Sequence, residues 1–279
     1  MRYGICTFPT EYSISPAELA RAAEERGFES LWVAEHSHIP ASRRSPFPGG
    51  GELPRIYYDV MDPFVALATA ASVTSRIRLA TGVCLLIQRD AIQTAKMVAT
   101  LDQLSGGRFL FGVGAGWNAE EMENHGTPFA QRTRVLREKI EAMKRLWTEE
   151  QASYEGEFVR FEASFAWPKP VQKPHPPIHV GGGWPGAARR AVRWGDGWIP
   201  VGLPDLAAKI PELRRMAEEA GRDPASIEVS IYSAPTNADA LARLRDAGIA
   251  RAVFFVPSEP AEKVLPLLDR LAATAREVG

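Results

Sequence analysis

The sequence predicts a (β/α)8 barrel, a closed ring of parallel strands in which each strand is followed by a helix. Short apolar segments alternate with helical patterns eight times along the 279 residues. The apolar segments are nearly continuous, as parallel strands covered on both faces should be. A doubly wound sheet would alternate too, but its phosphate motif should follow the first strand, where this chain has Phe8-Pro9-Thr10. We therefore expect one barrel domain over residues 1–279.

The composition suits a globular protein with a sizeable core, because 45% of the residues are hydrophobic and 24% are charged. The formal net charge of −1 gives no reason to expect a nucleic acid or an anionic membrane as partner. No apolar run approaches the roughly 20 residues of a membrane span. Met1 leads straight towards a strand, so we expect no signal peptide and a cytoplasmic location. Cys6 and Cys84 fall in predicted strands and are expected to be buried thiols.

The first half of the chain supplies four strand–helix units. Ser15, Pro16 and Glu18 have the spacing of a helix start with a capping box. Gly106 and Gly107 end the third helix just before the fourth strand. The predicted strands cover residues 2–8, 29–34, 77–86 and 108–113, and the predicted helices cover residues 15–26, 63–74, 90–104 and 128–147.

Two segments interrupt this alternation. Residues 36–62 contain prolines and glycines that forbid regular structure, and so long a connection is usually a lid or a binding loop. Residues 149–176 contain an expected hairpin at 152–161 and then an extended proline-rich connector. The alternation then resumes, with strands at 178–180, 197–201, 227–232 and 252–256 and helices at 186–194, 205–220, 237–247 and 261–276.

A glycine run after the fifth strand is the best candidate for an anion site, since the active site of such a barrel lies at the carboxyl ends of its strands. Backbone N–H groups at a helix N-terminus, unobstructed by side chains, suit a phosphate. A flexible turn is the alternative, although one glycine would suffice for a turn. The run is Gly181, Gly182 and Gly183, and it precedes Trp184 and a helix with Arg189 and Arg190.

The exit of the fourth strand, GVGAG at 112–116, is a weaker indication. With Gly114 and Gly116 it has a G-x-G-x-G pattern, which is more often a tight strand exit than a cofactor motif. Its interest lies in Trp117 and Asn118, which would place a flat surface and an amide at the barrel mouth. Plain core packing is an equally good explanation of Trp117.

His36 is the best acid–base candidate, because it ends the second strand beside the carboxylate of Glu35, which would orient or tune it. No Ser-His-Asp or Cys-His arrangement is evident. A metal site is not expected, since the histidines beyond His36 and His38 lack ligand spacing. The residues alone favour a flat phosphorylated cofactor over a metal or a covalent mechanism.

Several stretches together resemble the luciferase-like monooxygenase family of flavin-dependent barrels, and within it the oxidoreductases that use the deazaflavin coenzyme F420 in place of FMN. The resemblance spans nearly the whole chain. It is carried by WVAEH at 32–36, TGVCLL at 81–86, TLDQLSGGRFLFGVGAGWNAEE at 100–121, REKIEAMKRLWTEE at 137–150, PVQKPHPPIHVGGG at 170–183 and RWGDGWIP at 193–200.

This resemblance implies roles for particular residues. Gly82 and Val83 match the position of a non-prolyl cis peptide behind the middle ring of the isoalloxazine. Glu35 and His36 match an acid–histidine pair facing deazaflavin and substrate, and Gly182 and Gly183 match the loop that binds the cofactor phosphate. In contrast, the sugar-phosphate dehydrogenases of the family have a catalytic glutamate where this chain has Trp117, which argues against a sugar-phosphate substrate. The loop residues that could meet a substrate are His38, Arg43, Arg44, Tyr57 and Tyr58.

The leading hypothesis is a coenzyme F420-dependent oxidoreductase that moves a hydride between the deazaflavin and a small organic substrate, with His36 handling a proton. The alternative is an FMN-dependent monooxygenase using dioxygen and a reductase partner. A phosphate-binding lyase or isomerase would need a Schiff-base lysine or metal-binding carboxylates, which are not evident. A cofactor-binding protein without turnover is a fourth interpretation. The resemblance also implies a homodimer that pairs through the second and third helices.

Overall fold

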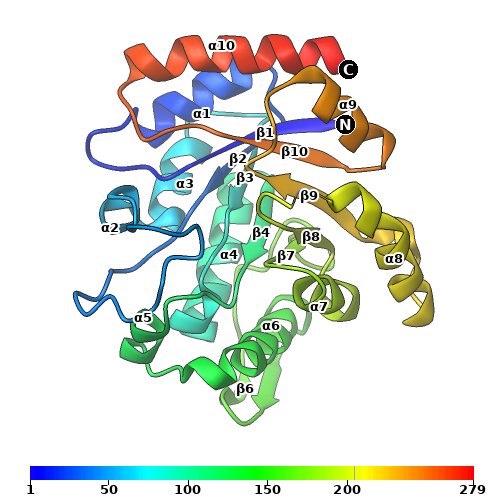
Figure 1. Cartoon of the computed structure of the whole chain (residues 1–279). Helices are drawn as coiled ribbons and strands as arrows, with labels where there is room; N and C mark the ends of the chain where they lie inside the picture. The colour runs from blue at the N-terminus through cyan, green and yellow to red at the C-terminus, as the bar shows by residue number, and fades with distance from the viewer. Residues whose placement is uncertain (204) are drawn as a thin grey trace.

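The structure, a computed structural model, describes residues 1–203 and 205–279. Its centre is a closed barrel of eight parallel strands, which confirms the predicted fold (Figure 1). The strands follow one another around the barrel in the order β1, β10, β9, β8, β7, β4, β3 and β2. Their bounds are β1 Arg2–Thr7, β2 Ser30–Val33, β3 Arg78–Thr81, β4 Phe109–Val113, β7 Ile178–Gly181, β8 Gly197–Ile199, β9 Glu228–Tyr232 and β10 Arg251–Phe255.

Helices cover the outside of the barrel (Figure 1). Several begin at side-chain caps, in which a Ser, Asp or Asn oxygen accepts a backbone N–H of the first turn, as at Ser15, Asp62, Asp90 and Asn237. The α-helices are α1 Pro16–Glu25, α2 Ile56–Asp59, α3 Pro63–Ala71, α4 Ala91–Leu104, α5 Ala119–Asn124, α6 Arg132–Thr148, α7 Gly186–Trp194, α8 Leu206–Glu219, α9 Ala238–Asp246 and α10 Ala261–Val278. Three short 3-10 helices are η1 Leu86–Gln88, η2 Phe129–Gln131 and η3 Pro224–Ser226.

Alternation along the strands divides the apolar residues into two clusters. Ile5, Leu31 and Phe111 belong to the large cluster that the helices cover. Their neighbours in the sequence point the other way and pack inside the barrel. This inner cluster is Cys6, Trp32, Ala80, Leu110, Ile199, Tyr232 and Val253, with Val83 packed against it.

The structure corrects two boundaries and adds two short helices. The third strand was expected to run to residue 86 but ends at Thr81, because the chain then leaves the ladder and returns only for a single bridge between Cys84 and Val113. The helix expected from residue 128 begins at Arg132, after the 3-10 turn η2. The short helices α2 and α5 were not predicted, since each is too short to show a helical period.

The long loop after β2 lies beside α5 (Figure 1). The Ser45 N–H donates to Oε1 of Glu120 at 2.9 Å, and the Ser45 hydroxyl donates to the same carboxylate. Burial opposes ionisation of Glu120, but these hydrogen bonds prevail and lower its pKa to about 2. The carboxylate therefore holds the loop against α5.

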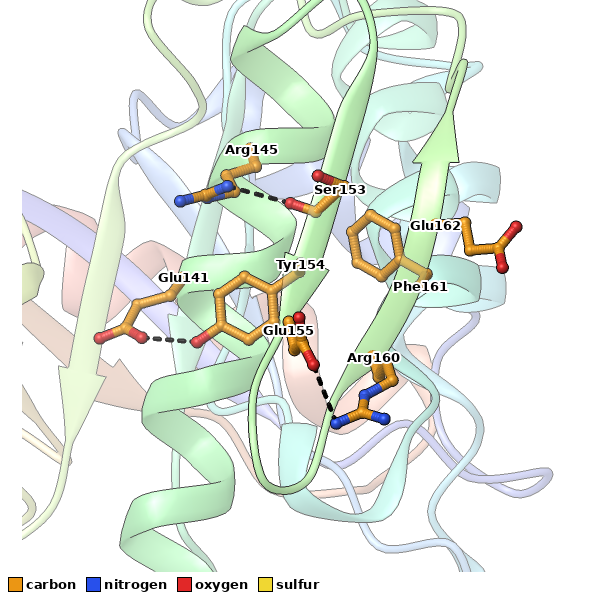
Figure 2. Close-up of a pocket in the computed structure, with 8 residues that line it drawn as sticks. All are labelled: Glu141, Arg145, Ser153, Tyr154, Glu155, Arg160, Phe161 and Glu162. Carbon is orange, nitrogen blue, oxygen red and sulfur yellow. Dashed lines mark hydrogen bonds and ion pairs between the residues drawn. The ribbon is translucent and has the colours of Figure 1, made fainter.

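The insertion before the fifth barrel strand forms a hairpin of β5 Ala152–Glu155 and β6 Arg160–Ser164 against α6. It borders a hollow of about 630 Å³ (Figure 2). Several polar groups there are paired: Tyr154 donates to Glu141 at 2.7 Å, and Arg145 donates to the Ser153 carbonyl at 3.1 Å. Because its lining comes only from α6 and the hairpin, this hollow lies away from the strand ends and we do not treat it as the active site.

The two cysteines are buried and unpaired, as expected from their place in the predicted strands. Burial raises the pKa of the Cys6 thiol to about 12, which makes it an inert packing group. Within the described residues, no helix combines the length and the apolar character that crossing a membrane would require.

Candidate functional site

His36 and Glu121 form a buried pair at the carboxyl end of the barrel. His36 follows β2, and Glu121 lies on α5, just beyond the exit of β4. Nδ1 of His36 is 2.7 Å from Oε2 of Glu121, and the two side chains are 6% and 0% exposed. The other carboxylate oxygen of Glu121 accepts the Ser37 N–H at 3.0 Å. Glu121 therefore fixes both the imidazole and the backbone beside it.

This pairing decides which nitrogen of His36 can react. An ionised carboxylate only accepts hydrogen bonds, so Nδ1 carries the hydrogen that faces Glu121. Nε2 makes no hydrogen bond to any residue in the described part of the chain, and it is left to accept or deliver a proton. A buried carboxylate behind the ring also stabilises the imidazolium that forms when Nε2 takes a proton.

Glu35 does not hold His36, which corrects the sequence-based expectation. Its carboxylate accepts the Leu85 N–H at 2.6 Å and pairs with the Arg89 guanidinium, which also pairs with Asp62. Adjacent residues in an extended segment point in opposite directions, so Glu35 faces the β3 exit while His36 faces the barrel mouth. Glu35 instead joins the chain segment after β3 to the start of α3.

Aromatic rings surround the imidazole. The centre of the His36 ring is 5.2 Å from that of Tyr57 and 5.9 Å from that of Trp117. Phe47 packs against both of these rings, at 5.3 and 6.0 Å, and Phe8 packs against Tyr57 at 4.8 Å. Trp117 is thus part of the site wall, and the loop supplies two of the rings.

The loop residues named from the sequence divide into two groups. Tyr57 and Arg43 lie in the aromatic group, with the Arg43 guanidinium 5.8 Å from the centre of the Trp117 ring. Arg44 points to the carboxylates of α5, and Tyr58 lies on the surface beside Arg55. His38 contacts Ser37, Asn124 and His125 on the outer rim.

A bulge at the end of β3 is built around Val83. The Gly82–Val83 peptide bond is cis, the geometry that the family resemblance predicts at this position. A Cβ added to Gly114 would lie 2.6 Å from Cγ2 of Val83, and one added to Gly181 would lie 2.9 Å from Cγ1. The glycines that end β4 and β7 therefore make room for the Val83 side chain.

Asn118 begins α5 but does not cap it with its side chain. It is 1% exposed, and both atoms of its amide are buried without a hydrogen-bond partner. Leaving such an amide unsatisfied costs about 1–3 kcal/mol, so a donor and an acceptor at this place indicate a polar ligand.

An unpaired guanidinium nitrogen lies beside the glycine run before α7. A Cβ on Gly182 would lie 3.6 Å from Nη2 of Arg190, and one on Gly186 would lie 3.5 Å from Nη1, so the guanidinium lies against this loop. Within the described residues Arg190 pairs with no carboxylate, and its buried Nε has no partner. Burial and the nearby Arg132 lower the pKa of Arg190. An anion at the N-terminus of α7 would relieve both effects.

Two tryptophans support this loop. Nε1 of Trp198 donates to the Gly182 carbonyl at 2.9 Å, and the Trp184 and Trp198 rings lie 5.6 Å apart. At the exit of β4, Gly116 has φ +67°, which a glycine adopts without strain. The site therefore contains a rigid bulge, an unpaired amide and an unpaired cation along one rim of the barrel.

A flat, phosphorylated cofactor fits these groups. The amide of Asn118 can pair with the polar edge of a ring, and Arg190 with the N-terminus of α7 can pair with a phosphate. A hollow of about 500 Å³ opens on the outer side of the Trp117 wall, next to Arg44 and Glu120. Within residues 1–203 and 205–279, no cluster of three or more His, Cys, Asp or Glu side chains could hold a metal ion.

Fold and site arrangement are those of a (β/α)8-barrel enzyme. The sequence profile described as luciferase-like monooxygenase matches residues 9–277, and the chain belongs to this family. An uncharacterised protein of Mycobacterium tuberculosis (strain ATCC 25618 / H37Rv) is 43% identical over 283 residues, which cover 98% of each chain. The F420-dependent glucose-6-phosphate dehydrogenase of Kineococcus radiotolerans is 32% identical over 77% of this chain and 61% of its own length. Monooxygenase RslO1 of Streptomyces bottropensis matches in structure with a TM-score of 0.77 and 25% identity, covering 99% of both chains.

Sequence reasoning missed Glu121, Phe47 and the unpaired state of Arg190. Glu120 and Glu121 were visible as two carboxylates after a strand exit, but which of them turns inward depends on α5, a helix of six residues. Phe47 lies in a loop with no period, so the sequence carries no sign of its direction.

Proposed function

We propose that this protein is a coenzyme F420-dependent oxidoreductase that transfers a hydride between the deazaflavin and a small organic substrate. The observation that carries the proposal is the buried His36–Glu121 pair, whose free Nε2 faces the ring-lined barrel mouth. An oxidoreductase of this kind needs a group that moves a proton while the hydride moves. Kinship with an F420-dependent dehydrogenase supports the choice of coenzyme.

Bound at this site, the deazaflavin would accept or supply the hydride. The chain's own residues would do the rest. In the oxidising direction, the substrate loses a hydride from carbon and a proton from its hydroxyl or amine, and Nε2 of His36 takes that proton. Glu121 keeps the imidazole in place and balances its charge. In the reducing direction, the imidazolium returns the proton.

The rest of the site would bind and orient. Gly182, Gly183 and Arg190 would hold the coenzyme phosphate at the start of α7. The Val83 bulge would support the ring from behind, and Asn118 would pair with its polar edge. The rings of the long loop would exclude water, which strengthens the electrostatic effect of Glu121 on His36.

An FMN-dependent monooxygenase is the second candidate function, because the chain is similar over 99% of its length to a monooxygenase. The same cradle could hold the FMN phosphate. The two candidates differ in chemistry, since the monooxygenase would use dioxygen and a reductase partner.

Side-by-side fluorescence titration of the apo-protein with coenzyme F420 and with FMN distinguishes these functions. Tight binding of F420 with none of FMN is the expected result, and it would lead to a substrate screen with the oxidised and reduced coenzyme. Preference for FMN would replace the proposal by the monooxygenase, to be followed by oxygen uptake. Binding of neither would refute both.

We also propose a homodimer that pairs through α3 and α4. These helices expose large apolar side chains, with Val65 67% and Leu104 66% exposed. Light scattering on the purified protein should give twice the chain mass, and the Val65→Glu/Leu104→Glu variant should give the mass of one chain.

A further inference from the structure

Arg43 is a cation without an anion at the mouth of the barrel. The buried Nη1 of its guanidinium has no hydrogen-bond partner, and no carboxylate lies within ion-pair distance among the described residues. Its guanidinium carbon lies 5.8 Å from the centre of the Trp117 ring. Stacking on a ring satisfies none of the five N–H donors of a guanidinium, so the donors at the buried end remain free.

The neighbouring Arg44 differs from Arg43 because carboxylates lie near its guanidinium. Arg44 is 71% exposed at its side chain and approaches the carboxylates of Glu120 and Glu123, each at 3.8 Å. Adjacent residues thus have opposite environments: one guanidinium is in solvent with anions nearby, and the other is turned inward without one. Ordinary surface charge accounts for Arg44 but not for Arg43.

Arg43 faces the same ring as the acid–base residue. Trp117 contacts the Arg43 guanidinium at 5.8 Å and the His36 ring at 5.9 Å, both measured to the indole centre. Phe47 and Tyr57 complete the apolar wall between loop and barrel. One small molecule lying along this wall can therefore reach the guanidinium at one end and the imidazole at the other.

We propose that Arg43 binds a carboxylate of the substrate, so that this enzyme acts on small organic acids whose apolar part lies among Phe47, Tyr57 and Trp117. The planar guanidinium fork matches a carboxylate in two hydrogen bonds, which orients the molecule as well as holding it. The far end of the acid then presents its reacting hydroxyl or amine towards His36. This inference rests on the proposed oxidoreductase function and adds the substrate class to it.

The alternative partner for Arg43 is an anionic group of the coenzyme. The arrangement favours the substrate, because the coenzyme anion has its own unpaired partner in Arg190 at the start of α7, while Arg43 belongs to the long loop that lies over His36 and Trp117. The experiment below separates the two sources.

The test is ligand-observed NMR titration of the full chain with benzoate and hexanoate, each compared with its neutral amide of the same shape. The apo-protein is expected to bind at least one acid about tenfold or more tightly than its amide. Arg43→Gln should abolish that preference, Arg43→Lys should retain part of it, and Arg44→Gln should leave it unchanged. Thermal unfolding of each variant checks that the fold is retained.

The titration is repeated with saturating coenzyme F420, where the acid is expected to bind beside the coenzyme. Failure of both acids to bind, equal binding of acid and amide, or an unchanged preference in Arg43→Gln would overturn the proposal. Displacement of the acid by F420, together with weaker F420 binding in Arg43→Gln, would assign Arg43 to the coenzyme and also overturn it. If no F420 binds while the acid preference depends on Arg43, the oxidoreductase proposal fails and the carboxylate site stands.

Discussion

The two ends of the barrel treat charge in opposite ways. At the amino ends of the strands, Arg251 is fully buried and donates two hydrogen bonds of 2.7 Å to the Glu29 carboxylate. It also pairs with Glu228, which in turn pairs with Arg2, and it donates to Ser230 at 3.0 Å. Each of these charges therefore has a partner of opposite sign at this end of the barrel.

At the carboxyl ends, several polar groups have no partner, although other charges there, such as Glu35 and Arg89, are paired. Arg43 and Arg190 have no carboxylate partner among the described residues, and both atoms of the Asn118 amide are unsatisfied. His36 has a partner on one nitrogen only. We call the amino end, where these charges are paired, the closed end, and the carboxyl end the open end. The unpaired groups at the open end are available to ligands, so this end carries the candidate functional site.

Replacing His36 should have the largest effect, because it removes the reacting group at the open end. The His36→Asn variant should lower kcat by about 10²- to 10⁴-fold, measured from the absorbance of the deazaflavin with a substrate found by screening. Its unfolding midpoint and its affinity for F420 should stay close to those of the wild type. Full activity in this variant would remove His36 from the mechanism.

Glu121→Gln provides a finer test of the same pair. A glutamine amide can donate to Nδ1, which favours the tautomer with its hydrogen on Nε2 and takes away the base. The loss of kcat should be smaller than in His36→Asn, and the pH profile of kcat/KM should change shape. A purely structural role for Glu121 would lower stability and leave the pH profile unaltered.

At the closed end, the main effect should be on stability. Arg251→Met leaves two partly buried carboxylates with only the half-exposed Arg2 as cation and should lower the free energy of unfolding by about 3 kcal/mol, as measured by urea denaturation. Arg26→Met, which breaks a surface pair with Asp269, is the matched control and should cost less than about 1 kcal/mol. Similar losses in the two variants would contradict the contrast between buried and exposed pairs.

Arg190 should matter for coenzyme binding and little for stability. Arg190→Gln should raise the Kd for F420 about tenfold or more, since a charge-assisted hydrogen bond to the phosphate is lost. Arg189→Gln, one residue earlier and exposed on the same helix, should leave the Kd unchanged. Equal effects of the two substitutions would point to general charge and not to a cradle.

Acid should lower the free energy of unfolding over the pH range in which His179 and Glu228, at the closed end, take up protons. Burial lowers the pKa of His179 from 6.5 to about 4, so the unfolded chain takes up this proton first and stability falls as pH drops from 6.5 towards 4. Although burial opposes it, Arg251 and other cations lower the pKa of Glu228 from 4.5 to about 2, and that contribution is lost between pH 4.5 and 2. Urea unfolding at several pH values measures this loss, and His179→Gln should flatten the curve above pH 4.5. A flat wild-type curve between pH 6.5 and 4 would show that His179 does not titrate as described.

The sequence by itself determined the architecture and the location of the site. The strand and helix periods, the glycine stops and the proline-rich interruptions predicted the barrel, its long loop and its hairpin insertion. They also placed His36, Trp117 and the glycine run at strand ends, because in a parallel barrel all carboxyl ends share one face. These features follow from local patterns that a single chain segment carries.

Only the tertiary structure decided which groups pair. Glu35 is adjacent to His36 in the sequence but binds Arg89, while Glu121, 85 residues away, takes its place behind the imidazole. The same holds for Arg43 and Arg44, which look alike in sequence but differ in having a carboxylate nearby. Barrel closure and the path of an irregular loop bring distant side chains together, and neither leaves a periodic trace in the sequence.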